Sequence, residues 1–220
     1  LSQRQKEIRR QEIEAIIPLK YPDERIYDGF IKNVKSNPNK VAIIDSSTGE
    51  EISYGELYDN ALKIAFYLQS EGIKKGDYIG ITLPRGSRQI FAIFGILFSG
   101  AAYVPIGITQ PNERRSKIYN QIGINHIISD EETIISCSLD NEEVKIIDLD
   151  KGMNSDKKLE MPVQVSPYDS AYIIMTSGTT GVPKGVEIMH TSAINTCIDL
   201  NKKYNINTND TVLMVSSCLL

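Results

Sequence analysis

The residues best suited to chemistry lie in one stretch, Thr176 to Gly185, which reads Thr-Ser-Gly-Thr-Thr-Gly-Val-Pro-Lys-Gly. Glycines let backbone N–H groups approach an anion closely, and hydroxyl groups add hydrogen-bond donors with little bulk. Lys184 adds a mobile positive charge. We therefore predict a phosphate-binding loop whose hydroxyl donors are Thr176, Ser177, Thr179 and Thr180.

Two familiar phosphate-binding motifs do not describe this stretch. A P-loop needs Gly-Lys-Ser/Thr at the start of a helix, whereas here Pro183 precedes the lysine and Gly185 follows it. A dinucleotide fingerprint needs Gly-x-Gly-x-x-Gly, which the stretch lacks. Taken alone, a stretch rich in Gly, Ser and Thr also fits a surface turn without a ligand, because such turns are common connections.

Apolar runs and turn signals predict the elements that position this loop. The predicted strands cover 41–45, 51–54, 78–83, 101–105, 126–129, 144–149, 171–175, 186–189 and 211–216. The predicted helices cover 29–36, 53–72, 88–98, 112–122, 131–136 and 191–204. The second helix should begin at a capping box, Ser53 with Glu56, and Ser87 is expected to cap the third. We expect 150–167 to be an irregular surface connection.

Strands alternate with helices from Glu56 onward, which is the βαβ pattern of a parallel sheet. We therefore predict an α/β fold in which helices cover both faces of a mostly parallel sheet. The length of 220 residues suits one large domain or one domain with an appendage.

Composition excludes several classes of protein. The net charge of −4 favours neither nucleic acid nor an anionic membrane surface. Residues 89–112 carry no charge, but Ser99-Gly100 and Pro105 interrupt them, so we predict a buried helix and strand rather than a membrane span.

Metal ligands and disulfides are not indicated either. The cysteines are odd in number and far apart, which suits a reducing cytosol and a cytoplasmic protein; they are Cys137, Cys197 and Cys218. His126 and His190 have no ligand spacing, so no metal site is predicted. We expect His190 to cap or pack the helix that follows the loop.

The ten residues from Thr176 to Gly185 resemble the phosphate loop of the adenylate-forming (AMP-binding) superfamily. That group includes acyl-CoA synthetases, luciferases and the adenylation domains of nonribosomal peptide synthetases. Residues 52–57 (Ile-Ser-Tyr-Gly-Glu-Leu) and 99–106 (Ser-Gly-Ala-Ala-Tyr-Val-Pro-Ile) resemble the first two core motifs of adenylation domains. Gly107 and Met175 depart from the pattern, where an acidic residue and tyrosine are usual.

The resemblance also implies a domain organisation. Tyr21-Pro22 and the residues around Phe30 resemble the junction between a condensation domain and a peptide-synthetase adenylation domain. Residues 1–28 would then be a linker from an upstream condensation-type domain. Residues 29–220 would be the N-terminal part of the adenylation domain's large subdomain, without the C-terminal subdomain. The pocket residues and the lysine of that subdomain are expected beyond Leu220, so the 220-residue piece alone is predicted to be inactive.

The implied activity is formation of an aminoacyl-AMP from ATP and an amino acid, with Mg²⁺ as the metal. The acyl group would pass to the phosphopantetheine arm of a peptidyl carrier protein. By this resemblance the four hydroxyl residues bind the β- and γ-phosphates, and Lys184 balances charge on the leaving pyrophosphate. Gly178, Gly181 and Gly185 would let the loop close and reopen.

Other functions stay open. One is an acyl- or aryl-CoA ligase or a stand-alone carrier-protein ligase of the same superfamily, and another is a non-catalytic fragment or interaction module.

Overall fold

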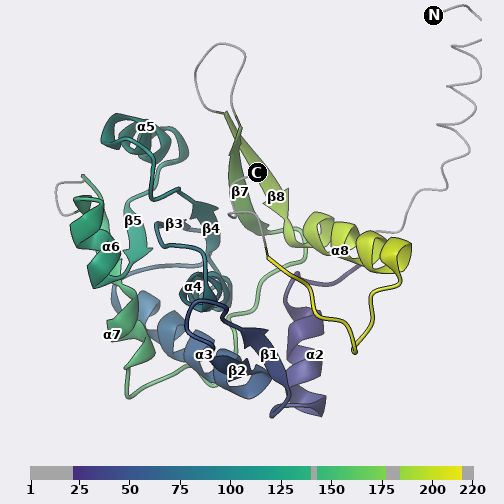
Figure 1. Cartoon of the computed structure of the whole chain (residues 1–220). Helices are drawn as coiled ribbons and strands as arrows, with labels where there is room; N and C mark the ends of the chain where they lie inside the picture. Colours follow the sequence, from purple (N-terminus) through teal and green to yellow (C-terminus); the bar gives the residue numbers. More distant parts are fainter. Residues whose placement is uncertain (1–21, 140–142, 177–183, 215–220) are drawn as a thin grey trace, which may run out of the picture.

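The structure is a computed structural model of the chain, and it describes residues 22–139, 143–176 and 184–214. Helices alternate with strands along most of this length, and a six-stranded sheet forms the centre (Figure 1). The predicted α/β fold is therefore confirmed. The predicted loop residues 177–183 and the segment 1–21 lie outside the described residues.

The central sheet is parallel except at one edge. Its strands are, in spatial order, β6 (Lys145–Asp148), β5 (His126–Ser129), β3 (Tyr78–Ile81), β4 (Ala102–Pro105), β7 (Ser170–Thr176) and β8 (Lys184–Met189). The first five run parallel, and β8 returns antiparallel to β7 as the second strand of a hairpin. This order confirms a mostly parallel sheet.

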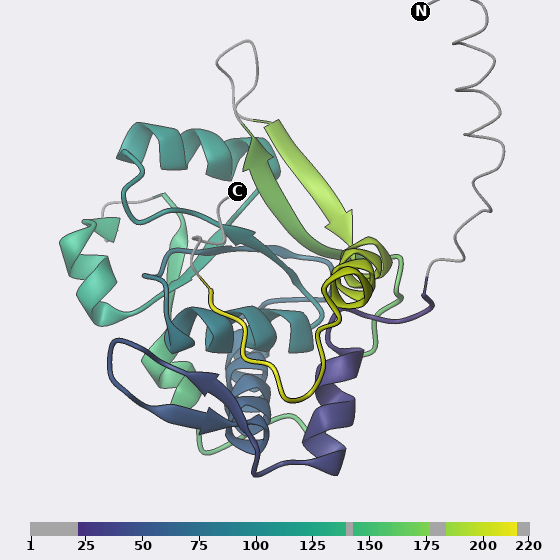
Figure 2. The same ribbon diagram turned by 45° about the vertical axis from the view of Figure 1, so that its right-hand side comes forward.

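Helices cover both faces of the sheet, which explains why its inner strands β3, β4 and β5 are mostly apolar and buried. Figure 2 shows α5 (Asn112–Ile122) above the sheet, with α4 (Ser87–Phe98) and then α3 (Tyr54–Ser70) below it. Ile127 belongs to the apolar cluster that contains residues of α5. Its neighbour Ile128 belongs to the cluster that contains residues of α3 and α4. Successive side chains of β5 thus point to opposite faces of the sheet and pack into two different apolar clusters.

A small antiparallel pair precedes α3. Strands β1 (Val41–Ile44) and β2 (Glu51–Ser53) form it, and α3 begins directly after β2. Ser53 accepts a hydrogen bond from the Glu56 N–H, and the Glu56 carboxylate accepts one from the Ser53 N–H, at 3.2 and 2.8 Å. The predicted capping box is confirmed, because both reciprocal bonds are present.

Three local predictions were wrong. Gly86, not Ser87, is the N-cap of α4, which begins one residue earlier than predicted. The connection after β6 contains a short helix, α7 (Leu149–Met153), because Leu149 is buried in the core. Residues 211–214 form no strand, since they are exposed and pair with no described strand; 215 and 216 lie outside the described residues.

The remaining helices lie at the periphery. They are α2 (Asp28–Ser36), α6 (Glu131–Ser136) and α8 (His190–Tyr204). Phe30 of α2 contacts Phe94 of α4, with ring centroids 4.4 Å apart. Tyr27, within the predicted linker 1–28, is only 1% exposed. The linker assignment stays a prediction, but its last residues pack on the body of the fold.

Helices α3 and α4 pack closely against each other at Gly95. A Cβ on Gly95 would lie 2.7 Å from the Cβ of Ile64 in α3. We expect Gly95→Ala to lower the free energy of unfolding by about 1–3 kcal/mol, because the two helices would have to separate. Urea titration measures the change.

Gly29→Ala in α2 is the matched control, since no atom lies within 4 Å of an added Cβ there. It should keep or slightly raise stability, because alanine favours a helix. Equal losses in the two variants would contradict the close-approach explanation.

Candidate functional site

The β7–β8 hairpin carries both ends of the predicted phosphate loop. Thr176 and Lys184 are its last paired residues, and the Thr176 hydroxyl donates to the Lys184 carbonyl at 3.2 Å. Thr176, Lys184 and Gly185 are exposed. The structure therefore brings three predicted site residues together. The other five, Ser177, Gly178, Thr179, Thr180 and Gly181, lie outside the described residues.

This hairpin places the two described ends of the predicted loop, Thr176 and Lys184, at the carboxyl edge of the parallel sheet. Strand β7 runs parallel to β4, so Thr176 ends at the same edge as Pro105 and Ile81. Ligands of open α/β sheets bind at this edge, beyond the carboxyl ends of the strands. The location agrees with the phosphate-binding interpretation of the loop.

Lys184 is a suitable cation for a phosphate at this edge. Its side chain is exposed, and no residue that the structure describes forms an ion pair with it. Its neighbour Gly185 has a packing reason to lack a side chain. A Cβ there would lie 2.7 Å from the Ile122 side chain of α5 and 3.0 Å from that of Ile173. The glycine lets the hairpin lie against α5 directly beside the lysine.

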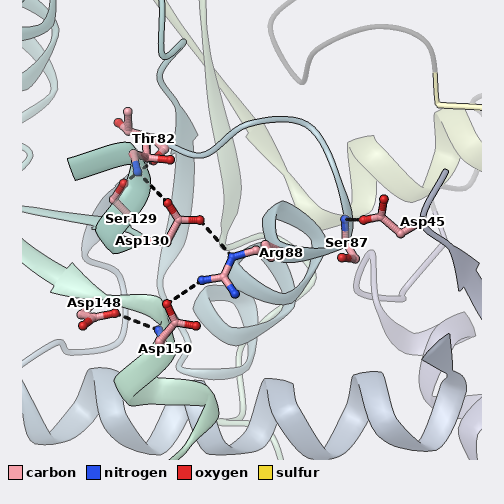
Figure 3. A network of polar contacts seen from close by, with 9 residues as sticks. Asp45, Thr82, Ser87, Arg88, Ser129, Asp130, Asp148 and Asp150 are labelled. Carbon is pink, nitrogen blue, oxygen red and sulfur yellow. Dashed lines mark hydrogen bonds and ion pairs between the residues drawn. The ribbon is translucent and has the colours of Figure 1, made fainter. Parts of the chain in front are cut away.

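Arg88, at the same edge, is already neutralised. Its guanidinium contacts Asp130 after β5 at 2.9 Å and Asp150 of α7 at 2.8 Å (Figure 3). Although burial opposes it, hydrogen bonds from Thr133 and Arg88 hold the pKa of Asp130 below its ordinary value. Arg88 thus joins α4 to α7 and to the end of β5, and it is a poor candidate for binding phosphate. Sequence analysis missed this cluster, because its members are far apart in the chain.

The N-terminus of α4 is occupied as well. The Asp45 carboxylate, from the β1–β2 turn, accepts the Ser87 N–H at 2.9 Å (Figure 3). Bonds from the Ser47 hydroxyl and then the Ser87 N–H hold the pKa of Asp45 well below its ordinary value. A carboxylate at a helix N-terminus satisfies the free N–H groups and the helix dipole. This end of α4 therefore offers no free anion site.

His190 lies buried at the start of α8, with 1% of its surface exposed. Its ring meets the Tyr27 ring edge-on, with centroids 5.5 Å apart. Burial, and then the charge of Arg25, lowers the pKa of His190 to about 4. The ring is uncharged at neutral pH and acts in packing. Its side chain does not cap α8.

The described part of the chain holds neither a metal-binding cluster nor a membrane-spanning helix. No group of three His, Cys, Asp or Glu side chains there could hold a metal ion. No helix among those residues is both long and apolar enough to cross a membrane. The described cysteines, Cys137 and Cys197, form no disulfide.

Comparison with known sequences supports one family. The family model described as AMP-binding enzyme matches residues 30–219. The anguibactin system regulator of Vibrio anguillarum is 41% identical over 199 residues, which cover 90% of this chain and 19% of that protein. Pyochelin synthetase PchE of Pseudomonas aeruginosa is 40% identical over 169 residues, 76% of this chain and 11% of that protein. The chain thus spans a fifth or less of these relatives' lengths.

Solved structures share the fold. The nonribosomal peptide synthetase FmoA3, in its α-methyl-L-serine-AMP bound form, gives a TM-score of 0.78 at 27% identity, over 90% of this chain and 21% of that one. The N-terminal subdomain of Klebsiella oxytoca NpsA, in complex with 3-hydroxybenzoyl-AMSN, gives 0.66 at 26% identity, over 76% of this chain and 41% of that one. The chain therefore has the fold of an N-terminal subdomain of this kind.

The Asp45 cap can be tested by mutation. Asp45→Ala should lower the free energy of unfolding by about 1–2 kcal/mol, because the buried Ser87 N–H loses its acceptor. Thermal or urea unfolding measures it, with the exposed Asp156→Ala as control. A loss no larger than in the control would show that Asp45 does not stabilise α4.

The buried His190 predicts a pH dependence. The unfolded chain takes up a proton near pH 6.5, whereas folded His190 does so only near pH 4, so stability is full above pH 6.5 and falls below it. Between pH 7.5 and 5 the loss should be about 2 kcal/mol. His190→Phe, which keeps a ring against Tyr27, should remove this part of the pH dependence. The exposed Asp156→Ala is the control, because burial lowers the pKa of the other histidine, His126, as well. An unchanged slope in His190→Phe would refute the assignment.

Proposed function

The chain belongs to the AMP-binding enzyme family, and we propose that it is the N-terminal part of an adenylation domain that activates an amino acid for nonribosomal peptide synthesis. The observation that carries this proposal is the family match over 30–219 together with a phosphate-type loop whose ends meet at the carboxyl edge of the sheet. Nonribosomal peptide synthetases with adenylation domains are similar to this chain in both sequence and fold.

The proposed reaction joins two anions. A carboxylate oxygen attacks the α-phosphorus of ATP, the new O–P bond forms, and the bond to the β-phosphate oxygen breaks as pyrophosphate leaves. The carrier thiol then loses its proton, its sulfur attacks the acyl carbonyl carbon to form a thioester, and the bond from that carbon to the phosphate oxygen breaks as AMP leaves. The main demand on the protein is to hold the triphosphate and offset its charge. Mg²⁺ would supply part of that offset, bound chiefly through phosphate oxygens.

The described ends of the loop suit this task. The exposed ammonium of Lys184 can reach an anion, since no described carboxylate binds it. Arg88 and the N-terminus of α4 are engaged by Asp130, Asp150 and Asp45, so they do not compete for the phosphate. We assign hydrogen bonds to the β- and γ-phosphates to the four hydroxyl residues, and charge compensation on the leaving pyrophosphate to Lys184.

The relatives' names support a proposal for the substrate class and the partners. One similar structure, FmoA3, is a nonribosomal peptide synthetase by name and holds an amino-acyl adenylate, and the relatives include bacitracin synthase 1 and gramicidin S synthase 2. An amino acid substrate, a peptidyl carrier protein domain and a neighbouring condensation domain in the cytoplasm are therefore proposed. An aryl acid is the second candidate, because the similar NpsA subdomain is in complex with a hydroxybenzoyl compound.

ATP–pyrophosphate exchange by the complete protein tests the proposal. Lys184→Ala should lower exchange about 10- to 100-fold, because charge on the leaving pyrophosphate is no longer balanced, and Thr179→Ala should lower it as well. Lys202→Ala, which removes an exposed lysine of α8, is the matched control. Absence of exchange with every amino acid in the wild type, or unchanged exchange in both loop variants, would overturn the proposal.

The molecule that accepts the acyl group distinguishes the remaining candidate functions. Transfer of the acyl group to coenzyme A would favour an acyl- or aryl-CoA ligase, and transfer to a carrier protein would favour peptide synthesis. No stabilisation by Mg-ATP in a thermal shift would favour a non-catalytic module.

A further inference from the structure

We propose that residues 22–27, which we call the strap, position the β7–β8 hairpin through a contact between Tyr27 and His190. This inference rests on the proposed function, because the hairpin carries both ends of the candidate phosphate loop. Tyr27 and His190 would act as positioning residues, far from the reacting atoms. The assignment gives a role to a segment that its composition marks only as a linker.

The strap is anchored by a buried aromatic ring. Tyr27 is 1% exposed and lies edge-on to both Phe98 of α4, at 5.3 Å, and His190 of α8, at 5.5 Å between centroids. Each such edge-to-face pair stabilises the folded state by about 0.5–1.5 kcal/mol beyond the contribution from burying apolar surface. Tyr27 therefore joins the central core to the start of α8.

Polar contacts hold the strap on either side of this ring. The Thr191 hydroxyl donates to the Pro22 carbonyl at 2.8 Å. Arg25 pairs with Asp28 at 2.9 Å, and its guanidinium carbon lies 5.2 Å from the centre of the Tyr27 ring. These contacts give the strap a defined position, which an unattached linker would lack.

His190 stands at the base of the hairpin. It directly follows Met189, the last residue of β8, and its N–H donates to the carbonyl of Asp169, which directly precedes β7. The ends of β7 and β8 that lie away from the loop therefore meet at His190, the residue that Tyr27 contacts.

The hairpin depends on its base because its pairing with the rest of the sheet is short. Strand β7 pairs with β4 at Tyr172 and Tyr103, whose rings stack at 5.2 Å, but it pairs with β8 as far as Thr176 and Lys184. Figure 1 shows the hairpin extending past the end of β4. Closer to the loop it lies against α5 at Gly185. A change at the base would therefore alter the angle at which the hairpin presents Lys184.

Hydrogen exchange on the complete protein tests the strap without requiring activity. In Tyr27→Ala, amides of 170–176 and 184–189 should exchange about tenfold faster or more, while α3 and β5 keep their protection. Tyr27→Phe keeps the ring and should match the wild type. Tyr168→Ala removes a tyrosine that is 61% exposed and is the matched control. Unchanged hairpin exchange, or an equal rise in β5, would overturn the proposal.

Thr191→Val gives a milder test in case Tyr27→Ala fails to fold, since it removes only the bond to Pro22. It should raise exchange in the same two strands by a smaller factor, and no rise there would count against the strap. In ATP–pyrophosphate exchange, Tyr27→Ala should raise the KM for ATP several-fold more than the KM for the amino acid. An equal rise in both would show general damage. A wild type without exchange would refute the proposed function, while hydrogen exchange still decides the role of the strap.

Discussion

The close approach of α3 and α4 at Gly95 is the constraint on which the fold depends. A parallel sheet must be covered on both faces, and here α4 covers one face while α3 covers α4. Because Gly95 has no side chain, Ile64 enters the space between the helices. Phe94 and Phe98 then lie beside Phe30 of α2. The N-terminal helix is thus attached through the same helix that supports the sheet.

Charge is distributed unevenly along the carboxyl edge of the sheet. Asp45 closes the N-terminus of α4, and Asp130 and Asp150 engage Arg88. These interactions fix the segments that follow β1, β5 and β6 against the start of α4, so they stabilise the edge but leave the Arg88 guanidinium occupied. Lys184, which comes from the hairpin at the other side of the sheet, has no such partner among the described residues. At this edge the paired groups Arg88, Asp45, Asp130 and Asp150 therefore stabilise the fold, whereas Lys184 is suited to binding a ligand.

Packing also changes how the start of the chain is understood. Two prolines and a polar composition make residues 18–28 look like a linker, because these features disfavour a helix. The structure uses the last of these residues as part of the core, through Tyr27. A segment can lack regular structure and still be attached to the core when a large ring is buried between two neighbours, as Tyr27 is between Phe98 and His190.

The sequence by itself determined the positions of most helices and strands, the α/β class and the family. These depend on local information: apolar periodicity, the Ser53–Glu56 capping box, and ten consecutive residues at the loop. Only the tertiary structure decided that Asp45 caps α4, that Arg88 joins two aspartates, and that Tyr27 meets His190. Each of these contacts joins residues far apart in the chain. No periodicity marks such partners, because their distance depends on how the helices pack on the sheet.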